Sequence, residues 1–322
     1  MQAHPPAGEC WVITNGAAGN ERQALALAGY LPLPVRAMVM EPRAPWSWLA
    51  PRRLPGGRLA WARPARHLLR PPWPTLVLGC GRTAALCTRV VRRLAGPECR
   101  SVQILDPRIG PRHWDLVIAP EHDGLTGPNV LTLPGSLNPV DDAWLADARQ
   151  AWTHLAACPA PRVGVLLGGP RHDVPMDAAW AQRLIEALSA RHRRDGGSLM
   201  LLASRRTPRA LFERLRRDLA ALPGLAWADA EDGANPYPGV LAHADRLVVT
   251  PDSVNMLSEA CATGRPVHTL VTTPLGAKLA AFHEGLRRRG RLHDIDAITP
   301  PSQPPLRETR TIAALLCQRL GW

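Results

Sequence analysis

Short apolar runs alternate with amphipathic stretches along the whole chain. In the first half we predict strands at 10–15, 35–40, 75–80, 101–106, 116–120 and 130–134. Between them lie predicted helical segments near 20–30, 82–95 and 139–157. Short buried runs that alternate with helices are typical of a parallel sheet covered on both faces. The pattern therefore predicts an α/β fold of the doubly wound kind.

A second alternation begins after the Cys158-Pro-Ala-Pro-Arg162 break. We predict strands at 162–168, 198–204, 225–229, 246–250 and 266–270. The predicted helices lie near 176–193, 208–221, 239–244, 253–263, 275–289 and 306–320, the last after a Pro-rich segment at 300–305. The 322 residues suit two domains, 1–157 and 158–322, each able to bury its own core. Ligands of open α/β sheets bind at the carboxyl ends of strands, which we expect to face an interdomain cleft.

The stretch from 235 to 270 carries the most chemical information. An apolar strand leads into the turn Pro251-Asp252-Ser253, where either Asp252 or Ser253 caps the following helix. Asn255 and Glu259 stand four residues apart on one helix face, which they share with Asp252. An acidic residue beside a helix N-terminus suits a nucleotide, because the amides attract the diphosphate and the carboxylate accepts from the ribose hydroxyls.

Two further loops follow predicted strands of the second domain. Gly168-Gly169 comes after the first strand and either lets a phosphate approach the backbone or simply makes a turn. Ser204-Arg205-Arg206-Thr207 ends the second strand. Its arginines would stabilise the growing charge of a departing diphosphate, with Ser204 and Thr207 as hydrogen-bond partners. Alternatively, Thr207 caps the helix that begins at Pro208.

Six segments, in this order and spacing, carry a family resemblance. They are TNGAAGNERQALALA (14–28), CGRTAALCTRVVRR (80–93), ILDPRIGPRHWDLVIAPEHDG (104–124), VLLGGP (165–170), LLASRRTP (201–208) and the block 235–268. The second half resembles the donor half of nucleotide-sugar glycosyltransferases with two Rossmann-like domains, the GT-B group. Most of the chain resembles one family more closely, that of the plant mitochondrial-fission protein named for elongated mitochondria. Some of its bacterial relatives are regarded as lipooligosaccharide outer-core glycosyltransferases.

The resemblance implies a GT-B-like fold whose last helix crosses back to the first domain. It also implies a nucleotide-diphosphate sugar bound by the second-domain residues named above, with Glu259 accepting both ribose hydroxyls. No metal and no cofactor are expected. The first domain would then supply the acceptor site. There His122 could take a proton from the acceptor hydroxyl while Asp123 orients it, although a histidine near a turn is often structural.

The net charge of +12 is unevenly distributed. From Pro42 to Pro97 the chain has eleven arginines and no acidic residue, and four tryptophans lie within 42–73. Arginine with tryptophan suits an anionic membrane surface, whereas the alternative is a solvated basic face over a small core. We expect no nucleic-acid partner, because no binding motif accompanies the charge.

Other features place the chain in the cytoplasm, either free or on the inner face of the inner membrane. The first sixteen residues lack the pattern of a signal peptide, and no run approaches the ~20 apolar residues that span a bilayer. The seven cysteines show no paired spacing and are expected to be reduced and buried. The leading hypothesis is transfer of a sugar to a lipooligosaccharide-core acceptor. The alternatives are a non-catalytic membrane adaptor and a nucleotide-sugar epimerase.

Overall fold

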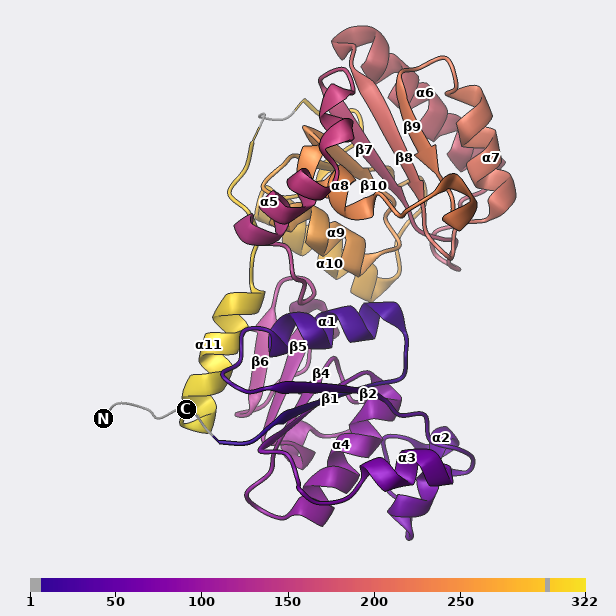
Figure 1. Ribbon diagram of the computed structural model, residues 1–322. Helices are drawn as coiled ribbons and strands as arrows, with labels where there is room; N and C mark the ends of the chain where they lie inside the picture. Colours follow the sequence, from indigo (N-terminus) through magenta and orange to yellow (C-terminus); the bar gives the residue numbers. More distant parts are fainter. Residues whose placement is uncertain (1–6, 299–301) are drawn as a thin grey trace. The chain divides into compact units, whose positions relative to one another are not determined.

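The chain forms two compact units in the computed structural model, which describes residues 7–298 and 302–322. The first unit extends to Pro139 and also contains Glu308–Trp322, whereas the second spans Val140–Arg307 (Figure 1). We predicted a boundary at 157/158, but residues 140–157 belong to the second unit. Parts of two predictions, the absence of a signal peptide at 1–16 and the Pro-rich segment 300–305, lie outside the described residues.

The first unit contains a six-stranded parallel sheet in the order β2-β1-β3-β4-β5-β6. Its strands lie close to the predicted positions, and each follows from a short run of apolar and β-branched residues. They are β1 (Cys10–Thr14), β2 (Val35–Val39), β3 (Leu76–Cys80), β4 (Arg100–Ile104), β5 (Leu116–Pro120) and β6 (Val130–Leu133).

Successive residues of β1 show how both faces of this sheet are covered. Cys10 and Val12 belong to a buried cluster that includes residues of α1 and α11. Trp11 and Ile13 point the other way, into a cluster that includes residues of α4. Because side chains alternate along a strand, a strand buried on both faces must be apolar throughout. The helices are α1 (Ala18–Ala28), α4 (Arg82–Ala95) and α11 (Thr309–Leu320).

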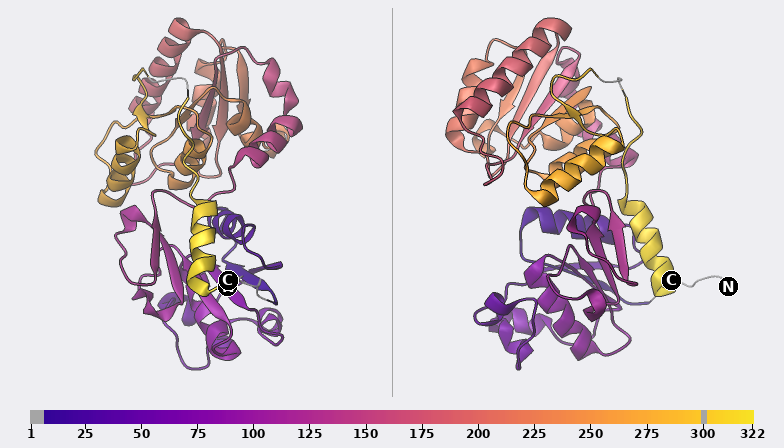
Figure 2. Two further views of the ribbon diagram at one scale, coloured as in Figure 1. Left: turned by 90° about the vertical axis from the view of Figure 1, so that its left-hand side faces the viewer. Right: turned by 180° about the vertical axis from the view of Figure 1, so that it is seen from behind.

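The last helix of the chain completes the core of the first unit. Its buried residues Ile312 and Leu316 join the cluster on the α1 face of the sheet. Thr309 fixes its start, because the hydroxyl donates to the carbonyl of Asn138 at 2.7 Å and accepts from the amide of Asn138 at 3.0 Å. In Figure 2 the yellow helix α11 lies against this unit, across its front in the left view and along its right-hand side in the right view.

The second unit contains another six-stranded parallel sheet, in the order β12-β11-β10-β7-β8-β9. Five of its strands correspond to predicted ones, and the short β12 was not predicted. They are β7 (Arg162–Leu167), β8 (Ser198–Ala203), β9 (Gly224–Trp227), β10 (Arg246–Val249), β11 (Val267–Thr269) and β12 (His293–Asp294). This confirms the predicted α/β class with two doubly wound parallel sheets.

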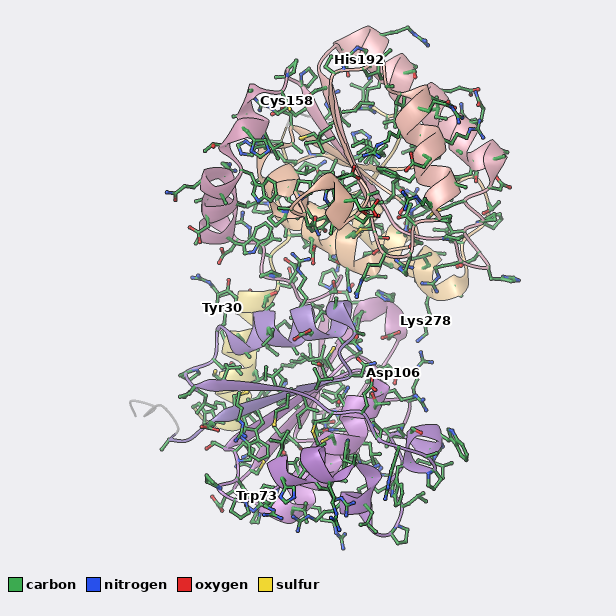
Figure 3. All side chains as sticks on the ribbon, turned by 45° about the vertical axis from the view of Figure 1, so that its right-hand side comes forward. Tyr30, Trp73, Asp106, Cys158, His192 and Lys278 are labelled. Atoms are coloured by element: carbon green, nitrogen blue, oxygen red, sulfur yellow. The ribbon has the colours of Figure 1, made fainter. Side chains whose placement is uncertain are left out.

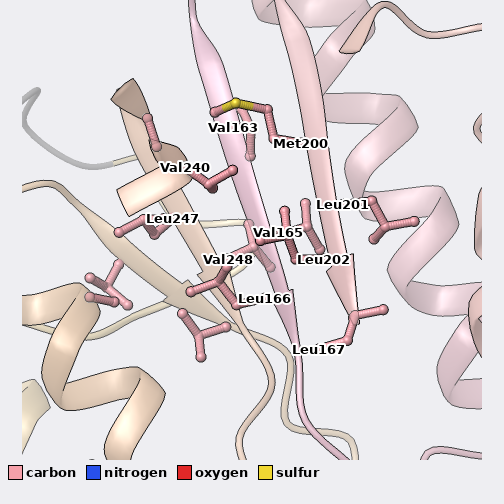
Figure 4. Packing of buried hydrophobic residues seen from close by; sticks show 14 of the residues in the cluster. Val163, Val165, Leu166, Leu167, Met200, Leu201, Leu202, Val240, Leu247 and Val248 are labelled. Atoms are coloured by element: carbon pink, nitrogen blue, oxygen red, sulfur yellow. The ribbon is translucent and has the colours of Figure 1, made fainter. Parts of the chain in front are cut away.

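The sheet of the second unit lies within one large apolar cluster. In the register of the two strands, Val165 of β7 stands beside Leu201 of β8 and Leu166 beside Leu202, and all four residues belong to this cluster (Figure 4). The covering elements include α5, which contributes Leu145 and Ala148 and explains why residues 140–157 belong here. The helices are α5 (Asp142–Ala151), α6 (Ala178–Asp195), α7 (Arg209–Asp218), α8 (Tyr237–His243), α9 (Val254–Ala262) and α10 (Ala277–Arg288), with short 3-10 turns η4 (Thr153–Ala157) and η5 (Ala230–Asp232).

The basic segment between β2 and β3 is a folded excursion of the first unit. Its elements are α2 (Trp46–Leu49), η1 (Gly57–Ala60) and α3 (Arg63–Leu68). Trp61 is 0% exposed, and the ring centroid of Trp73 lies 6.0 Å from that of Trp11 (Figure 3). Only Trp48, at 75% exposure, presents most of its indole to solvent. Three of the four interleaved tryptophans, Trp46, Trp61 and Trp73, therefore belong to or pack against the core of this unit.

All seven cysteines are free thiols, as expected, and five of them are buried. Burial raises the pKa of Cys10, Cys99 and Cys261 to about 12, so these thiols are protonated and unreactive near neutral pH. Within the described residues, no helix is both long and apolar enough to cross a bilayer.

Candidate functional site

The predicted donor-binding residues gather where three parallel strands of the second unit end. Read as β9-β8-β7-β10-β11-β12, its sheet has the order 3-2-1-4-5-6. The order of the strands reverses between β7 and β10, and such a reversal is where open α/β sheets bind ligands. Gly168-Gly169 follows β7, the Ser204–Thr207 loop follows β8, and Asp252 follows β10. Because the three strands are parallel and each loop follows the carboxyl end of a strand, the three loops lie at the same edge of the sheet.

Asp252 joins the ends of β7 and β10. Its side chain is buried, and one carboxylate oxygen, Oδ2, accepts from the amide of Gly169 at 3.1 Å and the guanidinium of Arg206 at 2.7 Å. The other, Oδ1, accepts from the hydroxyl of Thr250 at 2.6 Å, and that hydroxyl in turn accepts from the amide of Gly168 at 2.7 Å. A buried carboxylate is stable here because it is paired and hydrogen-bonded.

The two glycines are needed by the chain itself. A Cβ on Gly168 would lie 2.2 Å from Oδ1 of Asp252, and one on Gly169 would lie 2.3 Å from the carbonyl oxygen of Arg206. Both distances are far below van der Waals contact. The amides of both glycines also donate hydrogen bonds within the chain. Asp252 and Thr250 therefore occupy the positions where we expected a phosphate to contact the backbone.

The loop after β8 is held by its own hydroxyl groups. Thr207 Oγ1 accepts from the amide of Ser204 at 2.8 Å and lies 2.6 Å from the carbonyl oxygen of Gly168, to which it can donate. Helix α7 has its N-cap at Pro208, without a side-chain cap. Thr207 therefore fastens the loop to β7 rather than capping the helix. Arg205 is exposed and forms no ion pair with any residue that the structure describes.

Helix α9 begins at this edge of the sheet. The hydroxyl of Ser253 accepts from the amide of Met256 at 3.4 Å, which identifies Ser253 rather than Asp252 as the N-cap. Asn255, in the first turn, is partly exposed. His283 lies 2.8 Å through Nε2 from the carbonyl oxygen of Pro251. Because burial lowers the pKa of His283 to about 4, its ring is neutral and Nε2 donates this bond.

Glu259 is buried, although we expected an open carboxylate. The side chain is 3% exposed, and the Tyr237 hydroxyl donates to its Oε2 at 2.5 Å. Tyr237 begins α8, which is separated from α9 by β10. The sequence analysis missed this partner, although Tyr237 lies within the block 235–268 that carries the family resemblance. In a sequence, a tyrosine followed by a glutamate does not by itself predict that the two side chains are in contact.

The local charges still favour an anion. Arg206 offsets the charge of Asp252, and the exposed guanidinium of Arg205 is left over. The N-terminus of α9 adds roughly half a positive charge and amides without intrahelical partners. An anionic ligand at this edge would therefore be held by Arg205 and the first turn of α9, not by the glycine amides.

The predicted catalytic pair belongs to the other unit. His122 and Asp123 form a 3-10 turn, η3 (Glu121–Asp123), immediately after β5, and both are half-buried. The neighbouring strand β4 ends in a loop where Leu105 and Arg108 have φ angles of 71° and 63°. Asp106 lies between them (Figure 3). Positive φ is uncommon for such residues and is often found near functional sites.

The sequence analysis missed this loop, because nothing in the sequence Leu-Asp-Pro-Arg predicts a left-handed backbone. Asp106 Oδ1 accepts from the amide of Arg108 at 2.8 Å, which stabilises the turn locally. The described residues also contain no group of three or more His, Cys, Asp or Glu side chains placed to hold a metal ion.

Solved structures share the fold at low sequence identity. The glycotransferase of kitacinnamycin has a TM-score of 0.55 and 14% identity, with 98% of this chain and 100% of that chain covered. Os79 from O. sativa, in complex with UDP, has a TM-score of 0.55 and 12% identity over 97% and 91%. A UDP-GlcNAc 2-epimerase from Methanocaldococcus jannaschii has a TM-score of 0.53 and 11% identity over 96% and 99%. The chain therefore has a GT-B-like fold.

Two sequence relatives narrow the classification. The chain is 32% identical over 290 residues to the mitochondrial fission protein ELM1 of Arabidopsis thaliana, with 80% of this chain and 67% of that protein covered. It is 23% identical to the uncharacterized protein RP120 of Rickettsia prowazekii (strain Madrid E), with 95% and 97% covered. The family model described as mitochondrial fission ELM1 matches residues 18–320. The protein thus belongs to the mitochondrial fission ELM1 family.

Proposed function

We propose that the protein is a glycosyltransferase that moves a sugar from a nucleotide-diphosphate sugar to a hydroxyl of a cell-envelope acceptor. The acceptor would be of the lipooligosaccharide-core type, reached from the cytoplasmic face of the inner membrane. The observation that carries the proposal is the contact of Arg206 with Asp252 at the strand reversal of the second unit, where α9 begins, with Arg205 exposed next to Arg206 in the same loop. Relatives in fold that bind UDP or act on UDP-GlcNAc support a nucleotide-sugar donor.

The proposed chemistry needs positively charged side chains rather than a metal ion. When the glycosidic bond to the diphosphate breaks, negative charge grows on the leaving phosphate oxygens. Arg205 has no competing ion pair within the described part of the chain, so it can follow that charge. The amides at the start of α9 would bind the same phosphates with fixed orientation. In the first unit, His122 would accept the proton of the acceptor hydroxyl, with Asp123 orienting the ring.

Glu259 would bind the ribose hydroxyls of the donor, with Tyr237 holding the carboxylate until the nucleotide arrives. A carboxylate accepts several hydrogen bonds, so the two ribose hydroxyls can replace the phenol as donors to it. The proposal requires the Tyr237 ring to move aside, because Glu259 is 3% exposed. Tyr237 is only partly buried and begins a short helix, which makes such a movement inexpensive compared with moving the sheet.

A second candidate function is a non-catalytic adaptor built on the same fold. One observation favours it: the amides of Gly168 and Gly169 are already satisfied inside the chain by Thr250 and Asp252. Glycine amides that are satisfied by an internal hydroxyl and carboxylate need no nucleotide as a partner. A nucleotide-sugar epimerase, the third candidate, has support only from fold similarity.

Binding of nucleotide sugars separates these candidates. A thermal-shift screen with UDP-, GDP-, ADP- and CMP-sugars, followed by calorimetry, should find at least one donor that stabilises the second unit by mass action. No binding to any of them would leave the adaptor. If binding is found, transfer of labelled sugar to purified core oligosaccharide separates the transferase from the epimerase, which would instead change the donor alone.

Glu259→Gln tests the donor site itself. Losing charge-assisted hydrogen bonds to the ribose should cost ~1.5–3 kcal/mol, a loss of affinity of about tenfold or more. The matched control is Tyr237→Phe, which removes the internal partner and should leave donor affinity equal or higher. If both variants lower the thermal stability equally and neither changes affinity, the pair is structural and Glu259 is not a donor ligand.

A further inference from the structure

A cavity of about 560 Å³ lies beside the basic excursion of the first unit, far along the chain from the proposed donor site. One wall is the loop that precedes and forms η1, and the other is the face of α4 that carries Val90 and Arg93. Its volume falls within the range of small-molecule sites, ~300–1,000 Å³.

The residues that lead into this loop are hydrogen-bonded to α4. The guanidinium of Arg82 donates to the carbonyl of Ala50 at 2.9 Å, and that of Arg89 donates to the carbonyl of Pro51 at 2.6 Å. Behind the loop, Ala60 and Trp61 are 0% exposed and belong to the same buried cluster as α4. The cavity is thus part of a packed structure and does not depend on a loose arm.

The lining combines cations with apolar walls. Its charged residues are Arg53, Arg58 and Arg93, and its apolar ones include Leu54, Leu59 and Val90. Arg58 donates to the carbonyl of Leu69 at 3.0 Å, which fixes its guanidinium in place. Arg53 and Arg93 are exposed, and neither forms an ion pair or a hydrogen bond with the residues that the structure describes. The cavity therefore presents guanidinium groups with unused donors.

None of the residues that line the cavity is acidic. The chain has no carboxylate from 42 to 97, Glu98 forms no ion pair with Arg53 or Arg93, and Asp115 already pairs with Arg92 at 3.3 Å and Arg100 at 3.6 Å. The clustered positive charge also lowers the pKa of neighbouring residues. Burial and then the charge of Arg53 lower the pKa of Arg89. Both effects act on His113 as well.

A ligand for this cavity must therefore carry an anion on an apolar body. Guanidinium groups match a phosphate best, because their planar forks donate two parallel hydrogen bonds to its oxygens. Leu54, Leu59 and Val90 would contact methylene groups, which an inorganic ion lacks. The same excursion exposes Trp48 at 75% and Leu49 at 43%, a combination suited to the headgroup level of a bilayer.

We propose that this cavity is a binding site for a phospholipid of the membrane, with the phosphate on Arg53 and Arg93 and the first methylenes against the apolar wall. The site would fix the first unit on the bilayer through one specific lipid rather than through diffuse attraction of the whole segment. It stands independently of the proposed sugar transfer.

The test compares two double variants with equal loss of charge. Arg53→Gln with Arg93→Gln changes the cavity, whereas Arg52→Gln with Arg63→Gln changes two exposed arginines of the same excursion that do not line it. All four side chains are exposed, so both proteins should fold, which circular dichroism and thermal unfolding would verify. Binding is measured by co-sedimentation with phosphatidylglycerol vesicles and by calorimetry with dihexanoyl phosphatidylglycerol below its micelle concentration.

We expect the wild-type protein to bind both probes, and the cavity variant to lose at least about tenfold more affinity than the control variant. The soluble lipid is the stricter probe, since diffuse attraction to a charged surface cannot hold a single molecule. Equal losses in the two variants would overturn the proposal in favour of diffuse electrostatics. Absence of vesicle binding would also overturn it, as would inorganic phosphate binding as tightly as the short-chain lipid.

Discussion

Replacing Asp252 tests the structural role of the carboxylate that joins β7 and β10. In Asp252→Ala two buried donors, the Gly169 amide and the Thr250 hydroxyl, lose their acceptor. An unsatisfied buried donor costs ~1–3 kcal/mol, and the Thr250 hydroxyl can rotate to reduce its share. Arg206 is about half exposed and returns to water, so it adds little. We expect the second unit to lose ~3 kcal/mol of stability.

Asp252→Asn provides the graded comparison. The amide keeps the shape of the side chain, and its oxygen can still accept from Gly169 and Arg206 while its nitrogen donates to Thr250 Oγ1. What is lost is mainly the charge assistance of these bonds, ~1–2 kcal/mol. The stability of the second unit should therefore be lowest in Asp252→Ala, intermediate in Asp252→Asn and highest in the wild-type protein.

Hydrogen exchange followed by mass spectrometry reads the two units separately, which a single denaturation curve of a two-unit protein does not. A loss of ~3 kcal/mol should speed exchange in β7 and β10 peptides about a hundredfold, with β3 and β4 peptides unchanged. Asp296→Ala, which removes an exposed carboxylate 3.6 Å from Arg183, is the control and should have little effect. Exchange in Asp252→Ala within about fivefold of wild type would refute the reasoning.

The second unit should also lose stability in mild acid. Burial lowers the pKa of His268 and of His283 to about 4, whereas each titrates near 6.5 in the unfolded chain. Below pH 6.5 the unfolded state therefore binds more protons than the folded state. As the pH falls from 6.5 to about 4, each histidine lowers the free energy of unfolding by up to ~1.4 kcal/mol per pH unit. His283→Gln, whose amide can still donate to Pro251, should show a shallower dependence in denaturation between pH 7 and 4.5, and an unchanged slope would exclude His283. Transfer activity should survive EDTA, because Arg205 can stabilise the leaving group; loss restored by manganese or magnesium would exclude a metal-free mechanism.

The sheets could be predicted from sequence because their strands are buried on both faces. A run such as Leu76–Cys80 must be apolar at every position, which makes it visible without any knowledge of its neighbours. β12 escaped prediction for the opposite reason. Its two residues, His293 and Asp294, form the edge strand of the sheet beside β11 and carry no apolar pattern of their own.

The boundary between the units and the details of the site were harder to predict from sequence, because both depend on contacts between residues that are distant in sequence. Helix α5 was recognisable as a helix, but its amphipathic face does not say which unit it packs against. Likewise, the loops at the strand ends were predicted to meet, since strand order dictates it. The burial of Glu259 behind Tyr237 and the closure of the glycine loop by Asp252 could not be predicted. They depend on side-chain directions, which local patterns do not specify.

The discontinuity of the first unit has a consequence for synthesis. The second unit, 140–307, is continuous, whereas the first unit needs Ile312 and Leu316, which are synthesised after the whole of the second unit. Domains usually finish folding in the order of their synthesis. Here the order is reversed: the N-terminal sheet must wait, with the face that α11 covers still open to water. The nascent chain is therefore most prone to aggregate through its earliest part, and any truncation before residue 308 would leave that face permanently exposed.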